Sequence, residues 1–180
     1  MTIITALSDG KTVWLGNNSA ISIGETPLDY DFDPWVKFGD WALGVTGNSF
    51  QQDFLEANLE QLEKNSDAPL QLTMFIRTLF LENYISVEER DAGTASFGIW
   101  CILVNKDGRV WDVDSHLAHS RIPSNKIWAR GSGIDYALGA DFATLKTQPE
   151  MPHSDRVHLA IEAAIANDTS CPGSAVVSKF

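Results

Sequence analysis

Residues 126–140 read KIWARGSGIDYALGA, and their character changes at the centre of the stretch. Residues 126–130 contain β-branched and aromatic side chains, which predict a short strand. The sequence Gly131-Ser132-Gly133 predicts a tight turn, and the spacing of apolar residues from Ile134 onward predicts a helix that ends near Pro149. The stretch therefore predicts a strand that turns directly into a helix.

Downstream of this stretch, the sequence predicts one more helix and one more strand. Ser154 is a suitable N-cap residue, and apolar residues at helical spacing continue to Asn167. Residues 174–178 then predict a closing strand.

Upstream of the stretch, short β-rich segments predict two hairpins near the N-terminus. Residues 3–7 and 12–16 flank an Asp-Gly turn signal, and residues 35–38 and 41–45 flank Gly39-Asp40. Three tryptophans lie in this part of the chain, and we interpret them as residues that fill a core or an interface.

The central part of the chain changes to a helical period. Apolar residues over 50–63 form one stripe of a single amphipathic helix, and a second stripe over 72–80 follows a break at Ser66-Asp67-Ala68-Pro69. Strands are predicted again over 97–104 and 110–113. Pairs of helices that alternate with antiparallel hairpins indicate an α+β fold, with two sheets in the middle and helices outside.

Composition limits the class of protein. The chain has 180 residues and a formal charge of −11, so we expect a single domain over 1–180 whose surface repels nucleic acid. It contains no apolar stretch long enough for a membrane-spanning helix and no signal-peptide pattern at its start. Two distant cysteines favour a reducing compartment. We therefore expect a cytoplasmic protein with neither nucleic-acid nor membrane partners.

Several segments in the same order resemble the proteasome β-subunit-like N-terminal-nucleophile (Ntn) hydrolases. The segments are 1–7 (MTIITAL), 13–19 (VWLGNNS), 39–49 (GDWALGVTGNS), 129–140 (ARGSGIDYALGA) and the tail 160–177. The segment at 129–140 is the most specific of them. The resemblance implies a four-layer αββα sandwich, which agrees with the element order expected from the residues alone.

The resemblance implies that Thr2 is the nucleophile. In the family, a threonine at the mature N-terminus attacks an amide carbonyl, and its own α-amine accepts the proton. A free α-amine has a pKa of about 8, low enough to act as a base near neutral pH. The amine of Thr2 is free only after Met1 is removed. Otherwise Thr2 is simply a β-branched residue that starts a strand.

Two charged residues that the family places beside the nucleophile are absent from the matching positions. Asn18, or Asn17 with a gap, stands where the family has an aspartate, and Trp35 stands where it has a lysine. Lys37 could replace that lysine through a shift in register. A nearby cation ordinarily changes a pKa by about 1–3 units, so its loss predicts slow threonine chemistry. The resemblance thus implies a degenerate catalytic set.

Other family positions are retained. Ser132 matches a serine that helps to orient the nucleophile, Asp168 matches an aspartate after the last helix, and Gly47 matches the oxyanion-hole glycine. Each also has a purely structural explanation, as a capping hydroxyl, a loop residue and a turn residue. Cys171 stands where the family has serine or cysteine. A hydrolase that uses Cys171 is a further option, but the sequence offers no base for it.

No metal or cofactor is expected. His116 and His119 have a spacing that suits a metal, yet no third ligand motif accompanies them, so we interpret them as part of a solvated loop. The sequence contains no nucleotide-binding glycine motif.

Two functional hypotheses follow. In the first, the protein is a self-assembling proteasome-β-like subunit, arranged in rings or stacks, whose peptidase activity is lost or altered. In the second, it is an active N-terminal threonine peptidase or amidohydrolase that uses Thr2 after Met1 is removed and acts on a peptide or amide substrate.

Overall fold

The computed structural model describes most of the chain. The described ranges are 2–23, 26–28, 33–47, 49–85, 88–90 and 94–180. Two larger antiparallel sheets and five helices make up most of this part of the chain. None of the described helices has the length and apolar character needed to cross a membrane.

The first sheet has the order β12-β1-β2-β13 and contains the strand of the stretch at 126–140. The hairpin expected at the N-terminus is confirmed, with Asp9 Oδ1 accepting hydrogen bonds from the backbone N–H groups of Lys11 and Thr12. These hydrogen bonds lower the pKa of Asp9. The strands are β1 (Ile3–Ser8), β2 (Val13–Asn18), β12 (Trp128–Gly131) and β13 (Ala175–Lys179).

The second sheet has the order β11-β10-β9-β6-β5. It contains the second expected hairpin and the two expected central strands, together with a strand that begins at His119. The sequence interpretation of His119 as part of a loop is therefore wrong. The strand was missed because β11 is an edge strand without a buried face. The strands are β5 (Trp35–Phe38), β6 (Trp41–Thr46), β9 (Trp100–Asn105), β10 (Arg109–Val113) and β11 (His119–Ile122).

Two short ribbons complete the strands. β3 (Ile21–Ile23) pairs with β4 (Thr26–Leu28), and β7 (Glu88–Arg90) pairs with β8 (Thr94–Ser96). The sequence interpretation did not include these pairs, because three-residue segments carry too little alternation to be recognised.

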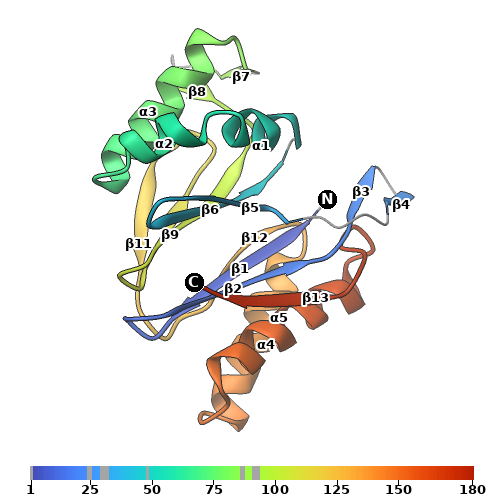
Figure 1. Ribbon diagram of the computed structural model, residues 1–180. Helices are drawn as coiled ribbons and strands as arrows, with labels where there is room; N and C mark the ends of the chain where they lie inside the picture. Colours follow the sequence, from blue (N-terminus) through green and yellow to red (C-terminus); the bar gives the residue numbers. More distant parts are fainter. Residues whose placement is uncertain (1, 24–25, 29–32, 48, 86–87, 91–93) are drawn as a thin grey trace.

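Helices α1 (Ser49–Glu56), α2 (Leu59–Lys64) and α3 (Pro69–Glu82) lie against the second sheet. The single helix expected over 50–63 is in fact two, because the chain turns at Ala57 and Asn58. Figure 1 shows these helices on the side of the sheet that faces away from β1 and β2.

Helices α4 (Ile134–Thr147) and α5 (His153–Asn167) lie against the first sheet. Helix α5 begins one residue earlier than expected, and Ser154 lies inside it instead of capping it. Figure 1 shows both helices on the side of the first sheet that faces away from β6 and β9.

Three groups of buried side chains hold these parts together. One lies between α1–α3 and the second sheet, and another lies between α4–α5 and the first sheet. The third lies between the two sheets and includes Ile4, Trp35 and Ile102. Strand β1 contributes to two of them by alternation: Ile3 and Leu7 face the helices, whereas Ile4 and Ala6 face the other sheet. A strand buried on both faces places the residue before it, Thr2, deep in the molecule.

Candidate functional site

Thr2 lies at the start of β1, an inner strand of the first sheet. Only 7% of its surface is exposed. On one side of it lies Gly131 at the end of β12, which has a positive φ of 115°. A Cβ atom on Gly131 would fall 1.9 Å from the carbonyl oxygen of Thr2. The glycine of the strand-to-helix turn therefore allows the chain to pass directly beside Thr2.

Asn18, at the end of β2, contacts Thr2 from the other side. The Thr2 hydroxyl donates to Asn18 Oδ1 at 2.5 Å, and the backbone N–H of Ile3 donates to the same oxygen at 2.9 Å. Asn18 Nδ2 donates to the carbonyl oxygens of Ala20, at 2.5 Å, and Pro172, at 2.8 Å. The structure thus selects Asn18, and not the alternative Asn17, as the partner of Thr2.

The surroundings of Asn18 match an amide and not a carboxylate. Two donors face its oxygen, while two carbonyl acceptors face its nitrogen, so all of the side chain's main hydrogen-bonding groups are used. The side chain is completely buried. A carboxylate here would bring negative charge against two carbonyl oxygens with no donor between them.

Trp35, in the position expected for the family lysine, is part of the core between the sheets. The side chain is 4% exposed. A Cβ atom on Gly44 of the neighbouring strand would lie 2.8 Å from the Trp35 ring and 2.8 Å from Ile4 Cδ1. The Trp35 ring therefore fits in this place because Gly44 has no side chain that would occupy the same space. The indole Nε1 is buried without a hydrogen-bond partner among the described residues.

Lys37 does not take the place of the missing lysine. Its ammonium forms an ion pair with Asp33 at 3.0 Å, and about half of its side chain is exposed. The cation that lies at this site is Arg130 of β12, which the sequence interpretation did not include. Its guanidinium donates to both carboxylate oxygens of Asp112, at 2.6 and 2.5 Å, and so connects the two sheets.

A cluster of three side chains lies next to the Thr2 region. It consists of Ser132, just before α4, and of Asp168 and Cys171, just after α5. The hydroxyl of Ser132 lies 3.3 Å from Cys171 Sγ, and this thiol donates to Asp168 Oδ2 at 3.3 Å. Burial acts to raise the pKa of Asp168, but hydrogen bonds from Ser132, the backbone N–H of Ser170 and Cys171 outweigh it and lower the pKa. Asp168 is therefore a carboxylate at neutral pH.

Cys171 is a poor candidate nucleophile. The residue is buried, and burial raises the pKa of its thiol to about 11. Because the thiolate is the reactive form, almost none of Cys171 is reactive near neutral pH. The same holds for Cys101, whose pKa burial raises to about 12.

An open pocket of about 330 Å³ lies over Thr2. We call it the Thr2 pocket. Its lining residues are Thr2, Thr46, Gly47, Trp100, Arg130, Gly131, Ser132 and Ile134.

The structure brings four of the five expected site residues to one place. Thr2, Gly47 and Ser132 line the Thr2 pocket, and Asn18 contacts Thr2 directly. Asp168 does not line the pocket, but hydrogen bonds connect it to Cys171 and Cys171 to Ser132. Sequence reasoning missed Arg130 and Trp100. For Arg130 a signal was available, because strand alternation at 128–130 places Trp128 and Arg130 on one face.

The two histidines with metal-compatible spacing lie outside this site. His119 is in strand β11, and His116 Nδ1 is 3.9 Å from Asp114. Within the described ranges, no three His, Cys, Asp or Glu side chains gather closely enough to hold a metal ion.

Comparison with known proteins gives a clear result for structure and none for sequence. No protein-family model and no curated protein matches the sequence. The fold is similar to that of BPH, the bacterial proteasome homologue of Thiobacillus denitrificans, solved in complex with epoxomicin. The TM-score is 0.81 at 18% identity, over 100% of this chain and 98% of that one.

Two further solved structures agree. A second structure of Thiobacillus denitrificans BPH has a TM-score of 0.81 at 19% identity, over 100% of this chain and 97% of that one. Eukaryotic HslV from Trypanosoma brucei has a TM-score of 0.70 at 18% identity, over 98% of each chain. The chain has the fold of a proteasome-β-like Ntn hydrolase.

This finding confirms the resemblance noted in the sequence. At 18–19% identity the likeness concerns the fold. The chemistry at positions 18, 35 and 130 therefore depends on the residues that this chain has there.

Proposed function

We propose that the protein is a proteasome-β-like subunit that assembles with copies of itself and in which threonine peptidase activity is lost or strongly reduced. Residues 1–180 then form a single domain, and the packing of two sheets between two sets of helices is the four-layer αββα sandwich of the family. The buried free thiols Cys101 and Cys171 support a reducing, cytoplasmic location.

The neutral surroundings of Thr2 support the part of this proposal that concerns peptidase activity. The hydroxyl donates its proton to an amide that is held by two backbone carbonyls, and the nearby position expected for lysine holds an indole. Among the described residues, Arg130 is the charged residue that lines the Thr2 pocket, and it pairs with Asp112 and not with Thr2. Without a cation or a carboxylate in contact with Thr2 among these residues, neither its hydroxyl nor its α-amine has the electrostatic help that the reaction requires.

The size of this effect is large enough to matter. A neighbouring cation changes a pKa by about 1–3 units, which corresponds to a roughly 10- to 1,000-fold change in the reactive fraction. Retention of Met1 would add a second obstacle, since the α-amine of Thr2 would be part of an amide and unable to accept a proton.

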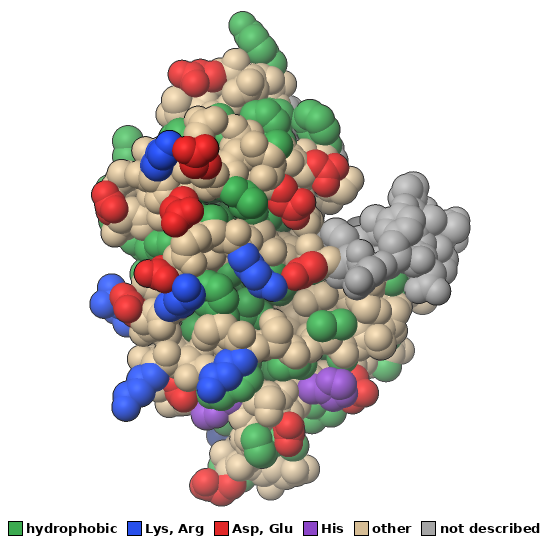
Figure 2. Space-filling model, in the orientation of Figure 1, with side chains coloured by type: hydrophobic (Ala, Val, Ile, Leu, Met, Phe, Trp, Pro, Cys, Tyr) green, Lys and Arg blue, Asp and Glu red, His purple; other side chains and the backbone are tan. Residues whose placement is uncertain are grey.

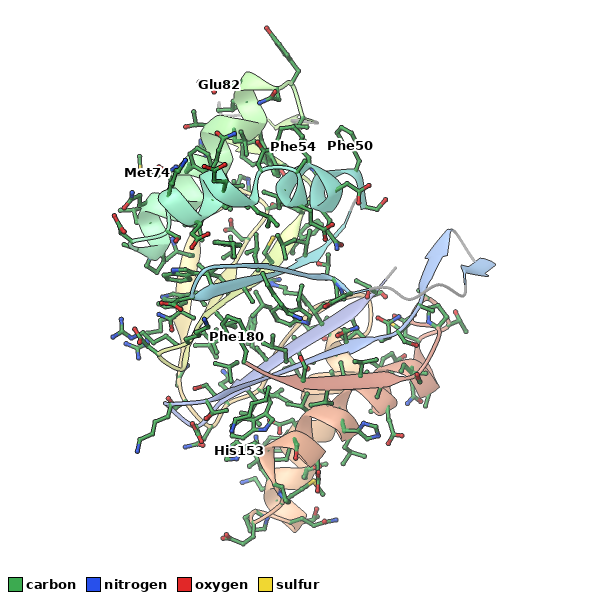
Figure 3. The ribbon with its side chains drawn as sticks, in the orientation of Figure 1. Phe50, Phe54, Met74, Glu82, His153 and Phe180 are labelled. Atoms are coloured by element: carbon green, nitrogen blue, oxygen red, sulfur yellow. The ribbon has the colours of Figure 1, made fainter. Side chains whose placement is uncertain are left out.

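Exposed apolar side chains on the outer helices support assembly. On one set of helices Met74 is 59% exposed, and on the other Phe142 is 66% exposed. Figure 3 shows Phe50 and Met74 on the outer side of α1 and α3, pointing away from the sheets. In Figure 2, hydrophobic and acidic side chains alternate over this end of the molecule. Large exposed apolar side chains on an outer helical face are available for contact with a second copy of the chain.

The tryptophans contribute little to this surface. Among the six, Trp35, Trp41 and Trp111 are buried, and Trp100 is exposed. The exposed apolar surface consists mainly of phenylalanine, tyrosine, leucine and methionine on helices.

The second candidate function is an active N-terminal threonine hydrolase that uses Thr2 after Met1 is removed. One observation favours it: Thr2 lines an open pocket together with Gly47 and Ser132, and the cluster behind it contains an ionised Asp168. BPH, a structural neighbour, binds epoxomicin. This arrangement would suit an amide or peptide substrate if a base were available.

Peptide hydrolysis distinguishes the two candidates. The wild-type protein and Thr2→Ala are incubated with a library of fluorogenic peptide amides, after Met1 has been removed with an aminopeptidase. We expect the two proteins to release fluorophore at the same background rate. Turnover that is present in the wild type and absent in Thr2→Ala would establish the second candidate.

Light scattering tests the assembly. We expect a mass of several copies at micromolar concentration. Met74→Glu and Phe142→Glu each place a charge on one helical face, and at least one of them should dissociate the assembly, while Gln71→Glu, an exposed change on α3, should leave it intact. A strictly monomeric wild-type protein would remove this part of the proposal.

A further inference from the structure

The Thr2 pocket has an unusual electrostatic character for this chain. The chain carries a net charge of −11, yet among the described residues that line the pocket the charged one is the cation Arg130. Trp100, which is 42% exposed, and Ile134 provide apolar walls. The hydroxyl of Thr46 donates to the carbonyl oxygen of Trp100, and that of Thr2 donates to Asn18, so neither proton is free for a ligand.

Arg130 is held in a fixed orientation by groups on both sheets. Its Nε and Nη2 donate to Asp112, and its guanidinium carbon lies 5.8 Å from the centre of the Trp128 ring. Asp112 also accepts a hydrogen bond from Trp128 Nε1, at 2.9 Å. This arrangement fixes the guanidinium before any ligand arrives, which reduces the entropy cost of binding.

Part of the guanidinium remains available. Two of the five N–H groups of the side chain donate to Asp112, and within the described ranges the others have no partner. About one fifth of the Arg130 side chain is exposed. A planar, partly buried guanidinium with free N–H groups is a favourable partner for a carboxylate.

We propose that the Thr2 pocket binds a ligand that presents a carboxylate to Arg130 and an apolar side chain to Trp100 and Ile134. This is the chemistry of the C-terminal residue of a peptide, and also of an N-acylated amino acid. A single arginine among apolar walls matches a monoanion better than a phosphate, whose double charge calls for several cations. The volume of about 330 Å³ suits one residue of this kind. The inference concerns binding alone, and it holds whether or not Thr2 is a nucleophile.

A pair of probes that differ only in charge tests the carboxylate. N-acetyl-L-phenylalanine and N-acetyl-L-phenylalaninamide are titrated into the wild-type protein, and binding is followed by NMR at the indole N–H of Trp100. We expect the acid to bind at least about tenfold more tightly than the amide, as a charge-assisted hydrogen bond requires. Equal affinities, or no shift of the Trp100 signal up to millimolar concentrations, would overturn the inference.

The source of the carboxylate is distinguished by a second pair of probes. A tetrapeptide that ends in phenylalanine is compared with its C-terminal amide and with N-acetyl-L-phenylalanine. If the tetrapeptide acid binds more tightly than the N-acetyl acid, the pocket recognises a polypeptide end. If both acids bind equally, it recognises the free acylated residue. Either result supports the carboxylate site, provided that the amide binds weakly.

Two variants separate the roles of Arg130 and Trp100. Because Arg130→Gln alone would leave Asp112 as an unpaired charge between the sheets, the test uses Asp112→Asn combined with Arg130→Gln. We expect this double variant to lose the preference for the acid. Trp100→Ala, whose binding is measured by isothermal titration calorimetry because the variant lacks the Trp100 indole, should weaken both probes by a similar factor and keep the preference. A double variant that still prefers the acid would overturn the inference, and if it fails to fold, the probe pairs on wild type and Trp100→Ala still decide. A hydrolysis assay on the same samples reports separately on Thr2.

Discussion

Two groups of residues close to Thr2, on the side of Ser132 and on the side of Asn18, differ in how they compare with the site that the family resemblance implies. On one side, Ser132, Cys171 and Asp168 form a hydrogen-bonded chain that ends in a carboxylate with a lowered pKa. On the other side, the charged pair that the family resemblance implies is replaced by Asn18 and Trp35. The first side has the residue types that the resemblance implies, whereas the second has uncharged residues in place of the charged pair.

The neutral side is adapted to the residues it contains. Asn18 satisfies two donors and two acceptors, and Trp35 fills space that Gly44 leaves open. Aspartate at position 18 and lysine at position 35 would therefore meet surroundings that do not suit them. The whole neighbourhood of these two positions fits uncharged residues, so we expect single substitutions to aspartate or lysine to damage the fold instead of creating activity.

The largest effect is expected for Trp35→Lys. The substitution removes a core ring and places an ammonium group in a position that is 4% exposed, so it should cost at least about 4 kcal/mol of unfolding free energy. Urea unfolding measures it. The control Trp35→Phe keeps an aromatic ring and removes an indole N–H that has no partner among the described residues, so it should cost about 1–2 kcal/mol. A stable Trp35→Lys protein would mean that the neutral side is not adapted to its tryptophan.

Asn18→Asp should cost about 2–4 kcal/mol at neutral pH, because it removes two donors and turns a negative charge toward two carbonyl oxygens. Burial favours the protonated form of the new carboxyl, so the cost should become smaller as the pH falls toward 5. Urea unfolding at several pH values checks both points. Asn65→Asp makes the same chemical change at a half-buried helix end, where the amide donates to the carbonyl oxygen of Gln61 alone, and it should cost less than about 1 kcal/mol. Equal costs at the two positions would contradict the account of Asn18.

On the retained side, Asp168→Asn should cost about 1 kcal/mol at neutral pH, since it weakens hydrogen bonds that favour the carboxylate. The pKa of Asp168 is lowered in the folded state. Its contribution to stability is therefore present above the unfolded pKa of about 4 and is lost as the pH falls through the folded pKa. Urea midpoints between pH 2 and 6 should show a steeper fall for wild type than for Asp168→Asn. Parallel curves would exclude this role.

The smallest effect concerns the cysteines. Burial raises the pKa of Cys171 to about 11 and that of Cys101 to about 12. Because these folded values exceed that of an unfolded thiol, about 8.5, their stabilisation is complete below that pH and is lost as the pH rises toward 11. We expect neither thiol of the folded protein to react with Ellman's reagent at pH 8, and both to react in urea. Rapid labelling of folded Cys171 would revive it as a nucleophile.

The sequence was sufficient for the order of the longer elements, because long periodic segments and turn signals define them. It did not show the break at Ala57 and Asn58, since the turn between α1 and α2 preserves the apolar stripe and buries Leu55 and Leu62 alike. It did not reveal β11 either, since the polar edge of a sheet lacks the alternation that identifies a strand. Local sequence patterns therefore predict long helices and strands well, but they predict breaks within helices and polar edge strands poorly.

The site residues were recognisable by position, but their partners were not. Thr2, Asn18 and Ser132 occupy motifs that can be aligned by eye. The two carbonyls on Asn18 come from Ala20 and Pro172, and the latter is 154 residues away in the chain. Arg130 pairs with Asp112 across two different sheets. Contacts of this kind depend on how the sheets stack, which no local pattern contains.

The central claim is that Thr2 does not act as an N-terminal nucleophile, and intact-mass spectrometry with epoxomicin tests it most directly. The protein is purified from its native host, and its mass is measured before and after incubation with this inhibitor. We expect an unchanged mass after incubation, even when the sample has first been treated to remove Met1. A native mass that lacks Met1, together with an epoxomicin adduct that Thr2→Ala does not form, would contradict the claim.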